Sequence, residues 1–178
     1  LREARKEVVD ILGDENVPAY STLGDWVNKG FISRKAEGKF RGAKYPDLIV
    51  VEIITAIKLE VEYGYKLIDI AEMRKAAGLN KGIKSIDKFK KVLYKYLNQL
   101  GEKQSEINSY EVFAYGDDEA EKHIRELEKV LSKIKKIGEK IELLGDYYRV
   151  FDATVPSVLS QIISKEINNL SDELSNKT

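Results

Sequence analysis

Basic and aromatic side chains gather in one short stretch of the sequence, between Tyr20 and Tyr45. Six basic residues lie there against two acidic ones, Asp25 and Glu37, so the stretch carries a net charge of +4. The whole chain of 178 residues has 30 basic and 30 acidic residues and no net charge. Positive charge confined to one small surface is what contact with nucleic-acid phosphates requires. The basic residues are Lys29, Arg34, Lys35, Lys39, Arg41 and Lys44.

The elements around this stretch can be read from apolar spacing and from glycine and proline. Apolar residues predict helices over 3–12 and 18–29, and the cluster "GDEN" at 13–16 predicts a turn between them. Gly30 is expected to end the second helix. Residues 31–45 lack a helical period, and the alternation around Glu37 and Gly38 predicts a small β-hairpin. Two further helices are expected over 46–63 and 65–77.

Two short helices joined by a turn, followed by a hairpin, form the layout of a winged helix-turn-helix. In such a domain the second helix enters the major groove and the hairpin, or wing, lies along the sugar-phosphate backbone. The side chains expected to reach bases are Tyr20, Ser21, Thr22 and Asp25. Those expected to hold phosphates include Arg34, Lys35, Lys39 and Arg41.

The second half of the sequence predicts helices only. Residues 79–84 read as a linker, 85–100 as a helix, and 117–144 as a long helix; 145–157 then read as a break before a last helix ending near 174. The long helix has apolar residues spaced by threes and fours, which indicates a coiled-coil seam for self-association. The fold class expected is therefore all-α with a small hairpin: a winged helix-turn-helix domain over 1–78 and a helical oligomerisation region over 79–178. The seam residues are Ile124, Leu127, Leu131, Ile134 and Ile141.

The residue types that are missing argue against several classes of function. The chain has no cysteine and one histidine, His123, which argues against thiol catalysis, disulfides, and thiolate or zinc sites. No Ser/His/Asp set or distinctive carboxylate pair emerges, so we expect neither an enzyme nor a cofactor. No apolar run approaches the roughly 20 residues that span a membrane. We expect a cytoplasmic, nucleoid-associated protein.

The stretch "STLGDWVNKGFIS" resembles the second helix of the MerR family of transcriptional regulators. In members of that family, this helix commonly contains a Thr-Leu pair and an aromatic residue, and it ends in Lys/Arg-Gly-Leu/Phe. "EGKFRGAKYPDLIVVEIITAIKLEVEYGYKLIDIAEM" resembles the rest of its DNA-binding domain, with a Gly-x-x-Arg wing and a Tyr before an acidic helix start. The resemblance covers about residues 5–77.

The resemblance implies a role for single residues of this sequence. Arg41 matches the wing arginine that reaches phosphate, and Tyr45 matches the aromatic residue that supports the wing or touches the backbone. Leu23 and Trp26 match core positions. The sequence departs from the family at Gly24 and Asp25, where an arginine and an aromatic residue are usual. An aspartate there would repel phosphate, but it could accept a hydrogen bond from a cytosine amino group.

The expected function is sequence-specific binding of duplex DNA by a transcriptional regulator that acts as a homodimer on an inverted repeat, with assembly into a tetramer left open. One alternative is a DNA-anchored adaptor, such as a segregation accessory factor, whose helical half binds a protein partner. Another is a sensor of small molecules, with a pocket formed by the tyrosine and phenylalanine clusters at 110–119 and 146–152.

Overall fold

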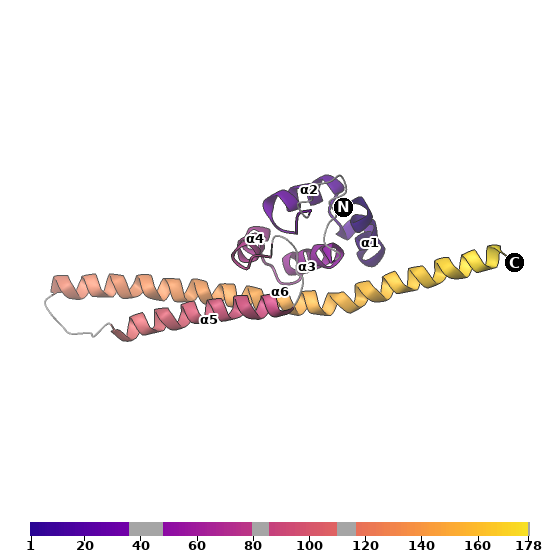
Figure 1. The fold of residues 1–178 in the computed structure, drawn as a ribbon. Helices are drawn as coiled ribbons and strands as arrows, with labels where there is room; N and C mark the ends of the chain where they lie inside the picture. Colours follow the sequence, from indigo (N-terminus) through magenta and orange to yellow (C-terminus); the bar gives the residue numbers. More distant parts are fainter. Residues whose placement is uncertain (36–47, 80–85, 110–116, 178) are drawn as a thin grey trace. The chain divides into compact units, whose positions relative to one another are not determined.

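The computed structural model describes residues 1–35, 48–79, 86–109 and 117–177, and this part of the chain is helical without strands (Figure 1). The all-α class is thereby confirmed, whereas most of the expected hairpin lies outside the described residues. The elements are α1 (Arg2–Leu12), the 3-10 helix η1 (Asp14–Asn16), α2 (Tyr20–Lys29), α3 (Ile49–Val61), α4 (Leu67–Ala76), α5 (Ile86–Ser109) and α6 (Asp117–Asn176).

The chain forms two compact units. One comprises Leu1–Lys84 together with Asp146–Thr178, and the other comprises Ser85–Gly145. The last part of α6 thus packs with the N-terminal helices, and the domain boundary expected at residue 78 stays a prediction. Side chains such as Tyr147 and Phe151 of α6 are buried, at 1% and 6% exposure.

The helices of the N-terminal segment begin and end close to where the sequence predicts. Gly30 ends α2 in the left-handed conformation with φ of 81°. Its amide donates to the carbonyl of Val27 at 3.2 Å, and the amide of Phe31 donates to the carbonyl of Trp26 at 2.9 Å. A side chain at position 30 would be strained in this conformation, which explains why glycine ends the helix there.

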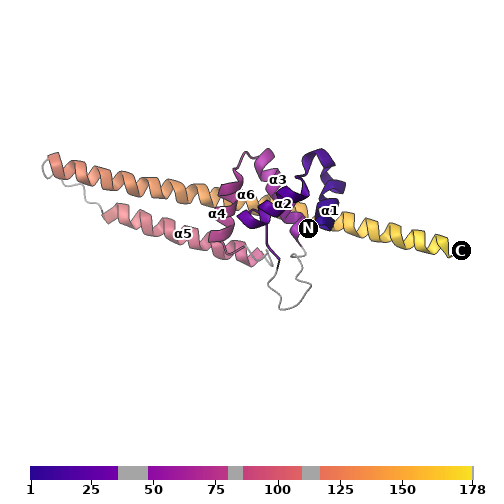
Figure 2. The same cartoon turned by 90° about the horizontal axis from the view of Figure 1, so that it is seen from above.

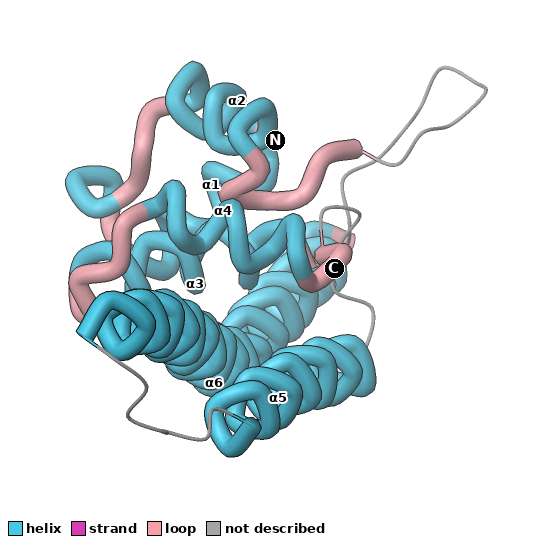
Figure 3. The backbone as a smooth tube through the Cα atoms, turned by 90° about the vertical axis from the view of Figure 1, so that its left-hand side faces the viewer, coloured by secondary structure: helices cyan, strands magenta, loops and turns pink. Residues whose placement is uncertain are grey.

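Helix α3 forms the centre of the first unit. Nearly every residue from Ile49 to Leu59 is buried, on all sides of the helix. A helix that is apolar all round must be surrounded by other elements. Figures 1 and 3 show α3 between α2 and α6. This core supports the short helices α1, α2 and α4, which could not be stable alone at their lengths.

Helix α6 is continuous where the sequence predicts a break, so the prediction of two helices separated by 145–157 is wrong. Pro156 lies inside the helix, although proline removes one backbone donor and crowds the preceding turn. The same segment buries an apolar face inside the first unit, including Val150 and Val158. Packing of that face outweighs the local preference of glycine and proline to end a helix. Helix α5 likewise runs to Ser109, beyond the predicted end near 100.

The second unit is a helical hairpin in which α5 and the first part of α6 lie side by side and antiparallel (Figures 1 and 2). Val130 of α6 is buried, and Leu127, Ile134 and Ile141 of the predicted seam are half-buried. The other two seam residues are exposed: Ile124 at 56% and Leu131 at 50%. The role of the five residues in self-association stays a prediction.

Within the described helices, none is long and apolar enough to cross a membrane.

Candidate nucleic-acid interface

Helix α2 has one buried face and one polar face. Leu23 and Trp26 are 0% and 5% exposed, and the Trp26 ring meets Phe31 edge-on, with ring centroids 6.2 Å apart. Because the two residues are three apart, they lie on the same side of the helix. The opposite side is exposed and polar, as a helix that lies in a groove requires. The exposed residues are Tyr20, Ser21, Thr22, Asp25, Asn28 and Lys29.

The positively charged side chain of Arg2, in α1, lies beside the beginning of α2. The guanidinium of Arg2 lies 5.3 Å from the centroid of the Tyr20 ring, a distance typical of a cation–π contact. The contact places an exposed positive charge beside the residues predicted to reach bases. Sequence reasoning missed Arg2, because nothing in the spacing of two residues so far apart predicts that they meet.

A second arginine fastens the connection between α1 and α2. Arg5 donates through Nε to the carbonyl of Pro18 at 2.8 Å, and its terminal nitrogen lies 2.7 Å from the Asp14 carboxylate. Val17 is buried beneath this connection, at 7% exposure. These contacts set where α2 begins relative to α1, so they position the polar face.

The basic segment begins directly after α2. Phe31, Ile32 and Ser33 are buried, and Arg34 and Lys35 that follow them are exposed. The chain thus passes from the core to the surface within five residues of the end of α2. The remaining residues predicted to contact DNA lie outside the described residues: Lys39, Arg41, Lys44 and Tyr45.

A buried polar network holds the point at which the basic segment leaves the core. The Glu52 carboxylate accepts from the Ser33 amide at 2.7 Å and from the Ser33 hydroxyl at 2.8 Å. Arg74 donates to Ser33 Oγ at 2.8 Å, to Glu52 at 3.2 Å and to the Tyr147 hydroxyl at 2.5 Å. Glu52, Arg74 and Ser33 are 0% exposed, and Tyr147 is 1% exposed.

This network joins four segments: the exit from α2, α3, α4 and α6. Burial alone lowers the pKa of Arg74, but Tyr147 and Glu52 raise it above its ordinary value, so the guanidinium remains charged. Sequence reasoning missed the network. Glu52 did offer a signal, because it is the one charged residue in the apolar run "IVVEIITAI", and a charge there needs a buried partner.

Burial raises the pKa of the Tyr147 hydroxyl well above its ordinary value, and this effect outweighs the opposing charge of Arg74. The unfolded chain ionises first, near pH 10. The stabilising contribution of the neutral hydroxyl is therefore fully present below that pH and is lost as the pH rises toward the folded pKa. For this one group we expect a loss of up to about 1.4 kcal/mol per pH unit above pH 10.

Tyr147→Phe is expected to make the fall in stability above pH 10 shallower than in the wild type. At pH 7 the variant should be less stable by about 1–3 kcal/mol, because Arg74 loses a buried acceptor. Denaturant unfolding from pH 7 to 11 measures both effects. Tyr94→Phe is the matched control, since Tyr94 is 64% exposed. Identical pH profiles for wild type and Tyr147→Phe would contradict the assignment.

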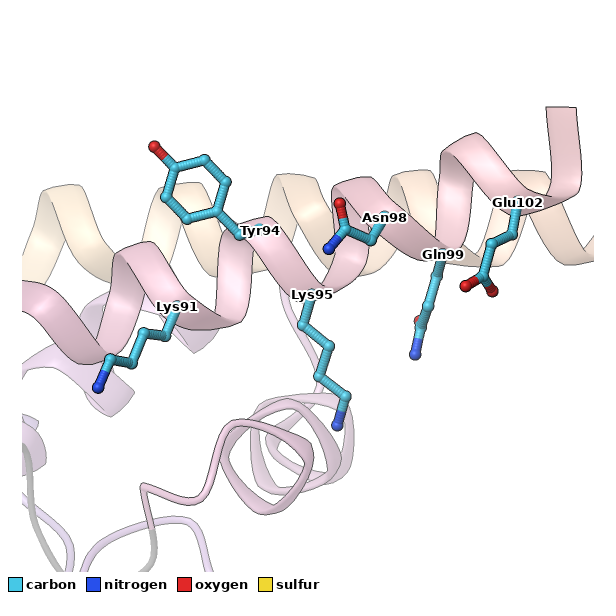
Figure 4. A pocket seen from close by; sticks show the side chains of 6 residues that line it. All are labelled: Lys91, Tyr94, Lys95, Asn98, Gln99 and Glu102. Atoms are coloured by element: carbon cyan, nitrogen blue, oxygen red, sulfur yellow. The ribbon is translucent and has the colours of Figure 1, made fainter. Parts of the chain in front are cut away.

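The aromatic clusters that suggested a ligand pocket are placed only in part. Residues 110–116 lie outside the described residues. Tyr147 and Phe151 stack at a centroid distance of 6.2 Å and are buried in the core of the first unit. A surface hollow is lined by α5 residues (Figure 4), and all six of its labelled side chains come from that single helix. Since no second element among the described residues of the unit lines it, we assign it no ligand.

Comparison of the chain with protein-family models, with curated proteins and with solved structures finds no match. The features of this chain that bear on function are therefore the geometry of α2, the network behind it and the resemblance in sequence.

Proposed function

We propose that this protein binds duplex DNA sequence-specifically and regulates transcription as a homodimer on an inverted repeat. The observation that carries the proposal is the two-sided character of α2. Leu23 and Trp26 anchor one side to the core, and the other side exposes short polar side chains. An α-helix with such a face fits the major groove, where the edges of all four base pairs can be distinguished.

The arrangement of charge around α2 supports the same role. Ser21 and Thr22 lie in the first turn of the helix, where recognition helices contact base edges and phosphates. Asp25 lies about one turn further on and can accept from a cytosine amino group, but it would repel phosphate. Arg2 lies beside the start of the helix, and Lys29 in its last turn. Phosphate contacts at both ends would fix the register of the helix on the duplex.

The resemblance to the MerR family supplies the remaining part of the proposal. It implies a wing that carries Lys39, Arg41 and Lys44, with Tyr45 supporting it. Arg34 and Lys35 are exposed at the point from which this segment leaves the core. A basic wing beside a groove-reading helix would add affinity without sequence preference, whereas α2 would supply the specificity.

The proposal is tested by selecting random duplexes with the purified full chain at moderate salt and sequencing those retained. We expect enrichment of an inverted repeat, whose half-site spacing would report the separation of two α2 helices. Retention that depends on salt but enriches no motif would mean that the protein only anchors to DNA, as the adaptor alternative holds. Absence of retention would remove DNA binding altogether.

Arg41→Ala is expected to weaken binding to all duplexes alike. Loss of one phosphate contact should lower the slope of log K against log salt concentration by about one unit. Titration of one selected and one random duplex across a salt series measures this. Arg125→Ala is the control, because Arg125 is 75% exposed on the hairpin of the second unit. Unchanged binding by Arg41→Ala would remove the wing from the proposal.

A further inference from the structure

The last part of α6 carries an exposed apolar stripe. Its residues are spaced by three or four, so they lie along one side of the helix. Together they present on the order of 400–500 Å² of apolar surface, comparable to the largest patch on a typical monomer, which is often functional. The residues and their exposed fractions are Leu159 (49%), Ile163 (54%), Ile167 (60%), Leu170 (60%) and Leu174 (68%).

The stripe faces away from the helices that α6 packs against in the first unit. Lys165 forms an ion pair with Asp10 of α1, with Nζ and Oδ2 2.5 Å apart. Ile163 and Ile167 are each two residues from Lys165, which is about 200° around an α-helix. Val158, one position before the stripe, is buried at 4% exposure. The side of α6 that carries Val158 and Lys165 thus faces its own unit, and the apolar stripe lies on the opposite side; every residue from Ile163 to Lys177 is exposed.

The last four residues of the stripe fit a coiled coil in one register only, in which Leu159 falls at a g position outside the seam. The steps from Ile163 to Ile167, Leu170 and Leu174 are four, three and four residues, which correspond to heptad positions d, a, d and a. Ile167 at a and Leu170 at d is the combination that favours two parallel strands. Leu174 at a and Ile163 at d is the reverse combination, so the parallel orientation depends mainly on charge. We propose that a second copy of this chain covers the stripe, forming a parallel, in-register two-stranded coiled coil over residues 163–174.

Charge selects the parallel orientation. In this register Glu166 and Glu173 occupy the g positions, and Ser164 and Ser171 occupy the e positions. Parallel strands place each g residue beside an e residue of the other strand, so glutamate meets serine. Antiparallel strands place g beside g, so glutamates of the two chains would face each other. Like charges so close are unfavourable, and only the parallel pairing avoids them.

The same charges disfavour a lipid surface as the occupant. Lys165 is the only basic residue between Leu159 and Leu174, and it is paired with Asp10. Acidic residues flank the stripe, whereas helices that lie on anionic membranes carry lysine and arginine on their polar side. The four apolar seam residues of two copies would bury roughly 700–800 Å², at the small end of the range for protein interfaces.

The proposal is tested by the mass of the full chain in solution. We expect the wild type to sediment with twice the 20.3 kDa mass of one chain, and Ile167→Lys/Leu170→Lys to sediment as a monomer. Both residues are exposed, so the variant should fold, which circular dichroism checks. Asn168→Lys/Asn169→Lys adds the same charges at positions b and c of this register and should remain dimeric. A monomeric wild type at micromolar concentration, or a dimer that survives the seam substitutions, would overturn the proposal.

Orientation is tested by cross-linking, for which the chain is suited because it contains no cysteine. In a parallel, in-register pair each a position meets itself, so Leu174→Cys should form a disulfide-linked dimer on mild oxidation. In an antiparallel pair position 174 would instead lie near position 163. Cross-linking only between Ile163→Cys and Leu174→Cys chains would therefore contradict the parallel arrangement.

The interface does not rest on the proposed DNA-binding function, and the two can fail separately. If Ile167→Lys/Leu170→Lys is a monomer that retains weak binding to a single half-site, both proposals stand. If the wild type is a dimer but does not bind DNA, only the DNA-binding proposal is contradicted. Leu131→Lys alters the exposed part of the earlier predicted seam and should remain dimeric. If Leu131→Lys is monomeric although its α6 stripe is unaltered, the interface lies on the second unit.

Discussion

Replacing Arg74 by methionine is expected to lower the free energy of unfolding by about 3–5 kcal/mol, because removal of one partner leaves a buried charge uncompensated. The guanidinium is 0% exposed and donates to Glu52, Ser33 and Tyr147. Methionine fills a similar volume but offers no donor. The Glu52 carboxylate would then remain in the core without a positive neighbour.

Urea unfolding at pH 7 measures this loss. Arg125→Met is the control, since Arg125 is 75% exposed and lies 3.7 Å from Glu121, a pair that contributes little. The double variant Arg74→Met/Glu52→Met should recover part of the stability, because both charges are then absent. A single variant that differs from wild type by less than about 1 kcal/mol would contradict an essential role for the pair.

The Arg74 variant should also affect DNA binding, through position rather than contact. Ser33 is held by Glu52 and Arg74, and Arg34 and Lys35 follow it directly in the chain. If Ser33 is no longer held by this network, the basic residues that follow it are no longer held in one position. We therefore expect weaker binding at temperatures where the variant is still folded.

Leu23→Ala is expected to lower the free energy of unfolding by about 2–5 kcal/mol, the range for truncating a large core residue. Leu23 is 0% exposed and, with Trp26, anchors α2 to the core. Thermal and urea unfolding measure the loss, and the fluorescence of Trp26, the only tryptophan in the chain, reports it locally.

Thr22→Ala, one residue away, is the matched comparison because Thr22 is exposed on the opposite side of α2. Alanine is the better helix former, so stability should not fall. If the protein binds DNA as proposed, preference for a selected duplex over random duplex should fall, because the proposal assigns base reading to this hydroxyl. If Thr22→Ala retains full preference, Thr22 does not read bases. If Leu23→Ala leaves stability unchanged, α2 is not anchored as described.

Local sequence signals sufficed for the helices near the N-terminus. The apolar spacing of 3–12 and 18–29 predicts α1 and α2, and Gly30 ends α2 as expected because only a residue without a side chain adopts φ of 81° without strain. The polar side of α2 follows from the same spacing. Tyr20, Ser21, Thr22, Asp25 and Lys29 are all exposed, as a surface helix with Leu23 and Trp26 inside requires.

Features that depend on residues far apart in the chain could not be derived in this way. The Arg74–Tyr147 hydrogen bond joins residues 73 apart, and the Tyr65–Asp146 bond joins residues 81 apart. The pairing of Arg2 with Tyr20 is equally invisible in the spacing. Each depends on which helices pack together, and helix packing is decided by the whole core rather than by neighbours in sequence.

The continuity of α6 shows most clearly what the sequence determined and what the tertiary structure determined. The amino-acid sequence by itself determined the apolar period on both sides of Pro156, and locally glycine and proline favour a break there. Only the tertiary structure decided that the helix continues, because Tyr147, Phe151 and Val158 are buried along one side. The free energy of burying those side chains exceeds that of one lost backbone hydrogen bond.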